Sequence, residues 1–501
     1  MSRSYTLRAI LFGALTFAFC ATPFVANADD AAPKKAKNVI LFIGDGNGFN
    51  SEIHGTYYHT GEGLGGESYH KFPVVLGSAT FMVHKHSDGT AVWDPLTEPE
   101  KNQGYVSKEF WKNMDGAKWR PTNTEVTDSG ASATAINTGI KTLNSYVSKN
   151  AKGENLENFA DLNYKVGRAV GIVSTDQISH ATPAASSAHN INRNNYAEIG
   201  KEQIDELPLT VLIGSGHPCY NNGKAIDKKP EELDYKFVGG REVWDAVSKN
   251  DGYKGWTFID DRPQFAELAA ATPDKKADLP KKLLGICRTT GDVPAVDGCI
   301  HDPNFTAQHY GQEAVDHIPT LAEMTLATLN IVSQNENGFY CMIEGGNIDH
   351  ANHSNDAAKS AREHVGLANA IDAAIEWVEK YSSWDETLMI VTADHETGQI
   401  WGEGTFDDID GNGRWSKEDE FIDFQPVPKT EKGKVPAIQY ASGSHTNTLV
   451  PVFIKGAGSE VAKYFVRGND PKAAKFWGFS GNYIYNSDIF NIMSTASGIH
   501  R

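Results

Sequence analysis

Six short apolar runs constrain the fold of this 501-residue chain more than any other feature of its sequence. Each run has the length of a buried strand, and segments with helical spacing lie between many of them. Strands that alternate with helices predict an α/β fold, with a central, largely parallel sheet sandwiched between helices. The predicted strands are 38–43, 169–174, 210–214, 338–343, 387–392 and 449–455.

The clearest helical segment is 356–381, where Ala361, Val365, Ala368 and Ile371 keep a 3.6-residue spacing. In sheets of this kind, ligands bind beyond the carboxyl ends of the strands. We therefore expect the functional residues to follow the predicted strands directly.

Three segments break the alternation, because they are rich in Gly, Pro, Asp and Lys. They are predicted to be irregular insertions in a single domain that covers residues 29–501. The predicted insertions are about 60–122, 215–310 and 400–444.

The first 28 residues have the pattern of a secretory signal peptide. Arg3 and Arg8 precede an apolar run at 9–20, and small residues end the segment at Ala28. The alternative is an N-terminal membrane anchor, but this run is shorter than the ~20 residues of a spanning helix. The sequence therefore predicts a periplasmic or secreted protein with no membrane segment.

The chain is acidic, with 46 Lys and Arg against 64 Asp and Glu and a net charge of −18. Removal of the predicted signal peptide takes away two arginines and no acid. A polyanion of this kind is a poor partner for nucleic acid or for anionic lipid. An anionic substrate would have to be attracted locally, by metal ions and a well-placed arginine.

Four cysteines remain after the predicted signal peptide, and export makes an oxidised pair plausible. We predict a Cys287–Cys299 disulfide, because both residues lie in one Gly-, Pro- and Asp-containing stretch. Cys341 lies inside a predicted strand and is expected to be a buried thiol. The sequence leaves the pairing open, since four cysteines allow three connectivities.

Acidic residues and histidines follow several predicted strands. Taken singly, each histidine is more often a structural hydrogen-bonding residue than a metal ligand. Together they provide more ligands than one ion needs, and mixed nitrogen and oxygen donors suit zinc, whereas oxygen donors suit magnesium. The candidates are Asp45, Glu344, Asp349, His353, Asp394, His395 and His445.

Ser129 is the candidate nucleophile, because it precedes a run of small residues that can begin a helix. A hydroxyl at a helix N-terminus meets amide groups and a dipole that favour an anion. The alternative is a capped helix with Asp128 or Ser129 as the N-cap. A neighbouring zinc would ionise the hydroxyl without a histidine base.

Six separated motifs resemble those of the alkaline phosphatase family in order and approximate spacing, over roughly residues 36–460. They are GDGNG at 44–48, TDSGASATA at 127–135, HATPAA at 180–185 followed by Arg193, EGGNIDHANH at 344–353, TADHE at 392–396, and His445-Thr446.

This resemblance implies an alkaline-phosphatase-like fold with two zinc ions and one magnesium ion. It implies hydrolysis of small phosphate monoesters through a phosphoserine at Ser129, with Arg193 as a fork that binds two phosphate oxygens. It also implies a homodimer. By residue matching, Asp349, His353 and His445 hold the first zinc, Asp45, Asp394, His395 and Ser129 surround the second, and Asp45, Thr182 and Glu344 hold magnesium.

His180 and His350 stand where the best-known enterobacterial members have Asp and Lys. The resemblance is here to the animal enzymes and to some marine bacterial ones, and it places His180 near the magnesium waters and His350 near the phosphate, through water. The departure puts in doubt which metal the third site prefers. The alternative is that both histidines only fill space.

Three other functions compete with this one. A sulfatase needs a Cys or Ser in a C/S-x-P-x-R context, which the residues after Ser129 do not provide. A phosphodiesterase of the same superfamily commonly uses Thr as nucleophile and lacks the arginine. A non-catalytic exported store of metal or phosphate would not turn over p-nitrophenyl phosphate.

The segment 408–419 matches the first six positions of a calcium-binding loop, D-x-[DN]-x-[DN]-G, and has a carboxylate at position 12. The sequence therefore predicts one structural calcium site in the 400–444 insertion. The alternative is an acidic, solvated turn. The predicted ligands are Asp408, Asp410, Asn412, Arg414 through its backbone carbonyl, Ser416 and Asp419.

Overall fold

The computed structural model describes residues 35–83, 105, 107–112, 126–249, 252–273, 279–300, 305–416 and 418–501. The predicted signal peptide lies outside these residues. By their contacts, residues 34–501 form one compact unit. Within the described part of the chain, no helix combines the length and the apolar character that a membrane crossing requires.

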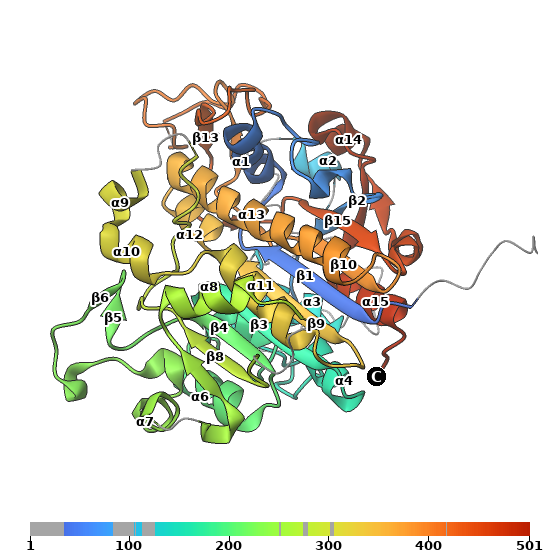
Figure 1. Cartoon of the computed structure of the whole chain (residues 1–501). Helices are drawn as coiled ribbons and strands as arrows, with labels where there is room; N and C mark the ends of the chain where they lie inside the picture. Colours follow the sequence, from blue (N-terminus) through green and yellow to red (C-terminus); the bar gives the residue numbers. More distant parts are fainter. Residues whose placement is uncertain are drawn as a thin grey trace, which may run out of the picture. The chain divides into compact units, whose positions relative to one another are not determined.

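An 11-stranded sheet forms the centre of the described structure (Figure 1). The seven strands from β10 to β7 run parallel to one another, while β15 is antiparallel to both of its neighbours. This confirms the predicted α/β class. In sheet order the strands are β16 (Gly468–Asn469), β17 (Asn482–Tyr485), β2 (Val74–Ala79), β15 (Val450–Gly456), β10 (Thr387–Thr392), β1 (Asn38–Gly44), β9 (Phe339–Gly345), β3 (Ala169–Gln177), β4 (Val211–Ser215), β8 (Leu283–Ile286) and β7 (Thr257–Ile259).

Each of the six predicted strands is present. The central parallel strands β1, β9 and β10 are buried on both faces, which explains why the sequence shows continuous apolar runs rather than alternation. β3 continues three residues past its predicted end, to Gln177. That extension brings Asp176 into the sheet.

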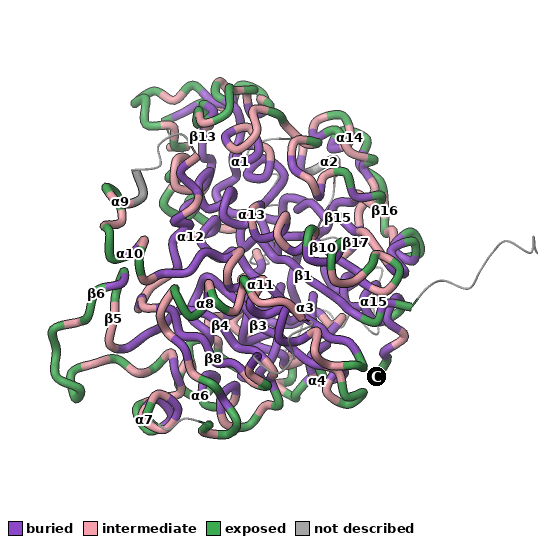
Figure 2. The backbone as a smooth tube through the Cα atoms, viewed as in Figure 1, coloured by how far each residue is buried: buried purple, intermediate pink, exposed green. Residues whose placement is uncertain are grey.

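Side chains of β1 alternate between two hydrophobic cores, one on each face of the sheet. Val39 and Leu41 belong to the first core, and Ile40 and Phe42 to the second. Helices α4 (Phe159–Lys165) and α15 (Ser487–Ser497) pack on the first face, and α8 (Arg262–Ala270), α11 (Leu321–Val332) and α13 (Ala357–Tyr381) on the second. Figure 2 shows the strands buried between helices that expose one side.

The predicted helix at 356–381 is α13. Asp356 is its N-cap and accepts a hydrogen bond from the Lys359 amide. Its apolar stripe packs against α11 and α1 (Phe49–Thr60), so the 3.6-residue spacing is used for burial on the sheet. The remaining helices are α2 (Ser107–Phe110), α3 (Ser129–Thr138), α5 (Ala181–Ala185), α6 (Tyr196–Lys201), α7 (Arg241–Lys249), α9 (Phe305–Tyr310), α10 (Gln312–His317), α12 (Asn347–His353) and α14 (Pro471–Trp477).

Two of the predicted insertions contribute strands to the main sheet. β2 comes from the segment 60–122, and β7 and β8 come from 215–310. Their runs are short and lie among polar residues, so the sequence pattern did not separate them from loops. Among the described residues of the segment 400–444, only β12 (Ile400–Gly402) and β13 (Ile438–Tyr440) form a regular pair.

The predicted Cys287–Cys299 disulfide is wrong, because both residues are thiols in the structure. The Cys287 thiol follows β8 and donates a hydrogen bond to the Met324 sulfur at 3.5 Å, against α11. Cys299 lies elsewhere, beside Tyr58 of α1, where burial and this thiol together raise the pKa of the tyrosine. Cys341 is a buried thiol, as predicted.

Candidate active site

The candidate ligands meet because four neighbouring strands end at one edge of the sheet. β10, β1, β9 and β3 are adjacent and parallel, so their carboxyl ends lie side by side. Asp394 follows β10, Asp45 follows β1, Glu344 lies at the end of β9 and Asp176 at the end of β3. The expectation that functional residues follow the strands is met at this edge.

Glycines let the loop after β1 pass close to its neighbours. Gly46 has φ +69°, and a Cβ there would lie 2.7 Å from the Asp349 Cα. A Cβ on Gly48 would lie 2.2 Å from the Glu396 Cγ. Only glycine fits at these two positions, so the loop that carries Asp45 can pass close to Asp349 and Glu396.

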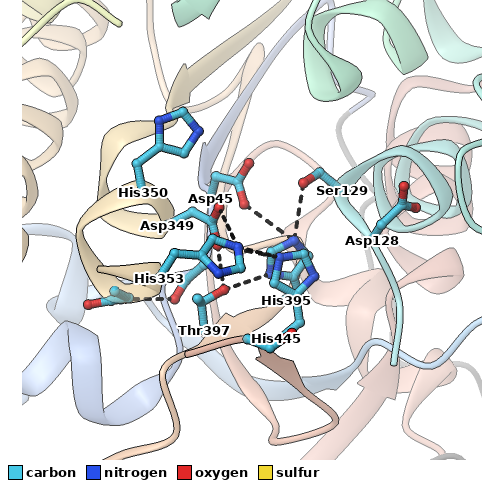
Figure 3. Close-up of polar contacts among 12 residues, drawn as sticks. Asp45, Asp128, Ser129, Asp349, His350, His353, His395, Thr397 and His445 are labelled. Atoms are coloured by element: carbon cyan, nitrogen blue, oxygen red, sulfur yellow. Dashed lines mark hydrogen bonds and ion pairs between the residues drawn. The ribbon is translucent and has the colours of Figure 1, made fainter. Parts of the chain in front are cut away.

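The first ligand group combines Asp349 and His353, four residues apart on α12, with His445 on β14 (His445–Thr446) (Figure 3). The His353 Nε2 lies 3.3 Å from an Asp349 oxygen and 3.0 Å from the His445 Nε2. The His445 Nε2 lies 3.6 Å from the other Asp349 oxygen. All three predicted ligands of the first zinc therefore face one point.

Backbone carbonyls fix the orientation of both imidazoles in this group. The His353 Nδ1 lies 2.9 Å from the Gly443 carbonyl, and the His445 Nδ1 lies 2.8 Å from the Thr127 carbonyl. A carbonyl can only accept, so in the neutral rings each Nδ1 carries the proton and each Nε2 presents a lone pair. Two lone pairs 3.0 Å apart repel each other unless a proton or a cation lies between them.

The second group surrounds the His395 Nε2, which lies 3.4 Å from Asp45, 3.2 Å from Asp394 and 3.2 Å from the Ser129 hydroxyl. Burial lowers the pKa of His395 well below its usual range, so the ring is neutral and able to bind a metal. Its Nδ1 lies 3.3 Å from the Thr397 hydroxyl, which donates to Asp349. Thr397 thus joins the two groups.

The third group brings oxygen atoms of Asp45, Glu344 and Asp176 within 4.8 Å of one another. The Ser174 hydroxyl donates to one oxygen of Glu344, and Thr182 lies beside that same carboxyl group. The sequence predicted Asp45, Glu344 and Thr182 here, but not Asp176.

Many oxygen atoms at this edge are buried without a hydrogen-bond donor. Burial raises the pKa of Asp45 well above its usual range, helped by Asp394, and raises the pKa of Asp394 to about 7, helped by Asp349. Carboxylates in such surroundings need cations to stay ionised, so the donor set fits metal ions. The unpartnered atoms are both oxygens of Asp45 and of Asp176, the Glu344 Oε1, the Asp394 Oδ2 and the Thr182 hydroxyl.

Ser129 is the first residue of α3, and Asp128 is the N-cap of that helix. The Asp128 carboxylate accepts the Ala131 amide at 2.8 Å, so the capped-helix interpretation is correct and coexists with a catalytic one. Ser132 faces elsewhere, since its hydroxyl donates to the Asp394 carbonyl. Of these two serines, only Ser129 directs its hydroxyl to a ligand side chain of the second group, the His395 Nε2.

Arg193 is held from two sides. Its Nη1 donates to the Asp128 carboxylate at 3.1 Å, and its Nη2 lies 3.2 Å from the His180 Nε2. The charge of Arg193 acts on Asp45 and on His395, so the guanidinium lies beside the second group.

His180 and His350 both lie near Asp176, with their rings 5.9 Å apart. The His350 Nδ1 binds Asp292 at 2.6 Å. Asp176, together with the hydrogen bond to Asp292, raises the pKa of His350 to about 10, against burial, which lowers it. Asp292 was missed because it lies in a segment interpreted as an insertion.

The predicted calcium loop lies outside this edge. Asp408 accepts the amides of Asn412 and Gly413 at 3.0 and 2.7 Å, and Asp419 accepts those of Ile409 and Ser416 at 3.0 and 2.6 Å. These bonds form a tight turn. Calcium binding at this loop stays a prediction.

Comparison with known proteins identifies relatives of the chain. The profile of the alkaline phosphatase family matches residues 98–468. Alkaline phosphatase 4 of Bacillus subtilis is 28% identical over 299 residues, which cover 58% of this chain and 54% of that protein. The Escherichia coli alkaline phosphatase is 28% identical over 379 residues, which cover 73% and 71%. The chain thus spans about half the length of the Bacillus relatives it matches.

Solved structures show the same fold. The alkaline phosphatase of the Antarctic bacterium TAB5 has a TM-score of 0.58 at 21% identity, covering 94% of this chain and 100% of that one. The Thermus thermophilus enzyme has a TM-score of 0.59 at 20% identity, covering 93% and 92%.

Without its metal ions, the folded protein should lose stability as the pH rises into the alkaline range. The unfolded chain ionises its Asp residues near pH 4, whereas folded, metal-free Asp394 and Asp45 hold their protons to higher pH. The contribution of these two protonated carboxyl groups to the free energy of unfolding is present at low pH. It is lost as the pH rises through their pKa values in the folded protein. From pH 7 to pH 9, above the ordinary histidine range, chelator-treated protein should lose roughly 3 °C or more of Tm beyond the loss of zinc- and magnesium-loaded protein. Parallel Tm curves for the two forms would contradict this.

Proposed function

Because the chain belongs to the alkaline phosphatase family, we propose that it hydrolyses phosphate monoesters to an alcohol and inorganic phosphate. The observation that carries the proposal is the position of Ser129. Its hydroxyl lies at the N-terminus of α3 and 3.2 Å from the His395 Nε2, in a group that also contains Asp45 and Asp394. A buried serine against metal-type ligands is suited to attack phosphorus.

The reaction would proceed in two displacements. The Ser129 hydroxyl gives its proton to solvent, its Oγ attacks phosphorus, the ester P–O bond breaks, and the departing alkoxide takes a proton from solvent to become the alcohol. Water then loses a proton to solvent as it attacks the phosphoserine, the serine oxygen leaves and takes a proton back, and inorganic phosphate is released. Ser129 is returned unchanged, so one serine supports repeated turnover.

Arg193 would act as the phosphate clamp, the side chain that holds two phosphate oxygens with its fork of N–H donors. Asp128 supports the role, because it fixes the Nη1 side of the guanidinium at 3.1 Å. Ser129 begins α3, and the dipole at a helix N-terminus favours an anion there.

We propose two zinc ions and one magnesium ion as cofactors. The histidine-containing groups, Asp349 with His353 and His445, and Asp45 with Asp394 and His395, suit zinc. Glu344, Thr182 and a shared Asp45 offer only oxygen, which suits magnesium. When bound, the zinc ions would lower the pKa of Ser129 and neutralise charge on the attacking and departing oxygens.

His180 and His350 would support phosphate binding from outside the ligand groups. His180 lies 3.2 Å from Arg193, and His350 exposes 30% of its side chain, which leaves it accessible to water near the phosphate. Export to the periplasm or medium and a homodimeric assembly are further parts of the proposal, carried by family membership and by the signal-like N-terminus.

Activity with and without metals tests the function. Zinc- and magnesium-loaded protein should hydrolyse p-nitrophenyl phosphate and other monoesters faster at pH 9 than at pH 6, and a diester at least about 10²-fold more slowly. EDTA should abolish the activity, and zinc with magnesium should restore it. Faster hydrolysis of the diester would favour the phosphodiesterase alternative, and no turnover of any ester by loaded protein would favour a store.

Ser129→Ala tests the nucleophile. The variant should form no phosphoenzyme and lose about 10³-fold or more in kcat, because its attacking oxygen is gone. The side chain is small and packs at a helix end, so Tm should change little. Ser132→Ala is the matched control, since Ser132 lies about one turn along the same helix and its hydroxyl contacts the backbone carbonyl of Asp394 rather than a ligand side chain. Phosphate that maps by mass spectrometry to Ser132 or Thr127 would overturn the assignment.

Calcium is the fourth cofactor in the proposal, bound by the loop 408–419. After chelation, and with zinc and magnesium held constant, millimolar calcium should raise Tm by about 1–3 °C if it binds only the folded state. Asp408→Ala with Asp410→Ala should remove that increment without loss of zinc. If calcium does not change the Tm of the parent protein, the loop is an acidic, solvated turn and the calcium site is wrong.

A further inference from the structure

Asp176 is the buried ionisable group at this edge that the proposed reaction does not use. It is completely buried at the end of β3, and neither of its carboxylate oxygens has a well-aligned hydrogen-bond donor. Gly346 closes one side, since a Cβ there would lie 2.7–2.8 Å from the carboxylate atoms. A carboxylate in such a position is costly unless cations or donors face it on the remaining sides.

Two histidines face one oxygen of this carboxylate. The Asp176 Oδ2 lies 2.6 Å from the His180 Nδ1 and 3.8 Å from the His350 Nε2. The first contact is close but bent, because its angle falls outside the range of a good hydrogen bond. The Oδ1 makes neither contact.

Arg193 determines which nitrogen of His180 carries the proton. Its Nη2 lies 3.2 Å from the His180 Nε2, and a guanidinium can donate but cannot accept. The Nε2 must therefore accept, which places the proton on the Nδ1 beside Asp176. This tautomer argues against His180 as a metal ligand through the Nδ1, although Asp176, His180 and His350 lie close enough together to bind an ion.

Asp176 also belongs to the third ligand group, with an oxygen within 4.8 Å of those of Asp45 and Glu344. Three buried carboxylates at one point repel one another, and a divalent cation removes that repulsion. The Glu344 Oε1 and the Thr182 hydroxyl are buried there without partners as well.

We propose that Asp176 links the third metal site to the phosphate clamp. One of its oxygens serves as a cation ligand with Asp45 and Glu344. The other holds His180 in the tautomer whose Nε2 accepts from Arg193. Asp176 is thus a metal ligand and, through His180, a positioning residue for Arg193, so the occupant of the third site influences phosphate affinity. This inference rests on the proposed function.

Asp176→Asn tests the link, because the amide keeps the shape of the side chain and removes its charge. The magnesium Kd of the zinc-loaded variant, measured by calorimetry, should rise at least about tenfold. Asp292→Asn is the matched control: it neutralises a carboxylate that contacts His350 and lies outside the third group, so its magnesium Kd should stay within about twofold. An unchanged magnesium Kd in Asp176→Asn would overturn the ligand role.

A double-mutant cycle with Arg193→Ala tests the positioning role. At saturating magnesium, Asp176→Asn should weaken binding of inorganic phosphate by about fivefold or more when Arg193 is present. In the Arg193→Ala background, the same change should have less than about a twofold effect, because the residue it positions is gone. Equal effects in both backgrounds would overturn the positioning role.

The parent protein separates failure of this inference from failure of the proposed function. A loaded parent that neither hydrolyses p-nitrophenyl phosphate nor binds phosphate would overturn the function itself. A parent that does both, with variants that show no metal effect or purely additive phosphate effects, would overturn only the role of Asp176. Zinc content and Tm of each variant confirm that the other sites and the fold remain.

Discussion

The structure depends on a concentration of buried carboxylates at one edge of the sheet. Asp45, Asp394, Glu344 and Asp176 come from four adjacent parallel strands, whose hydrogen bonding leaves no freedom to move them apart. Burial raises the pKa of Asp45, helped by Asp394, and raises that of Asp394, helped by Asp349. The sheet therefore gathers buried negative charge that is unfavourable by itself and that metal ions are suited to neutralise.

His353 and His445 can serve as metal ligands at this edge because backbone carbonyls orient their rings. The Gly443 and Thr127 carbonyls accept hydrogen bonds from the Nδ1–H groups of His353 and His445, so both rings present their Nε2 lone pairs inward. Thr397 extends the same organisation, since it joins His395 to Asp349. Such outer contacts fix ligand geometry before any ion binds, which reduces the cost of assembling the site.

The residues proposed to bind the substrate also share their supporting contacts. Asp128 caps α3, and its carboxylate also holds Arg193, so the helix that carries Ser129 and the proposed phosphate clamp share one support. His180 holds the guanidinium from the other side and leads to Asp176. The proposed nucleophile, phosphate clamp and third metal site are thus connected by short polar contacts rather than by separate supports.

The sequence by itself determined the six buried strands, the helix from Asp356 to Tyr381 and the kinds of ligand at the strand ends. These features are local, because apolar runs, helical spacing and capping residues act over a few neighbouring positions. Only the tertiary structure decided that β2, β7 and β8 join the sheet and that Cys287 and Cys299 lie apart. It also decided that Asp292 reaches His350 across 58 residues and that the Thr127 carbonyl orients His445 across 318. Contacts of this separation follow from how the sheet is assembled, and no local pattern in the sequence records them.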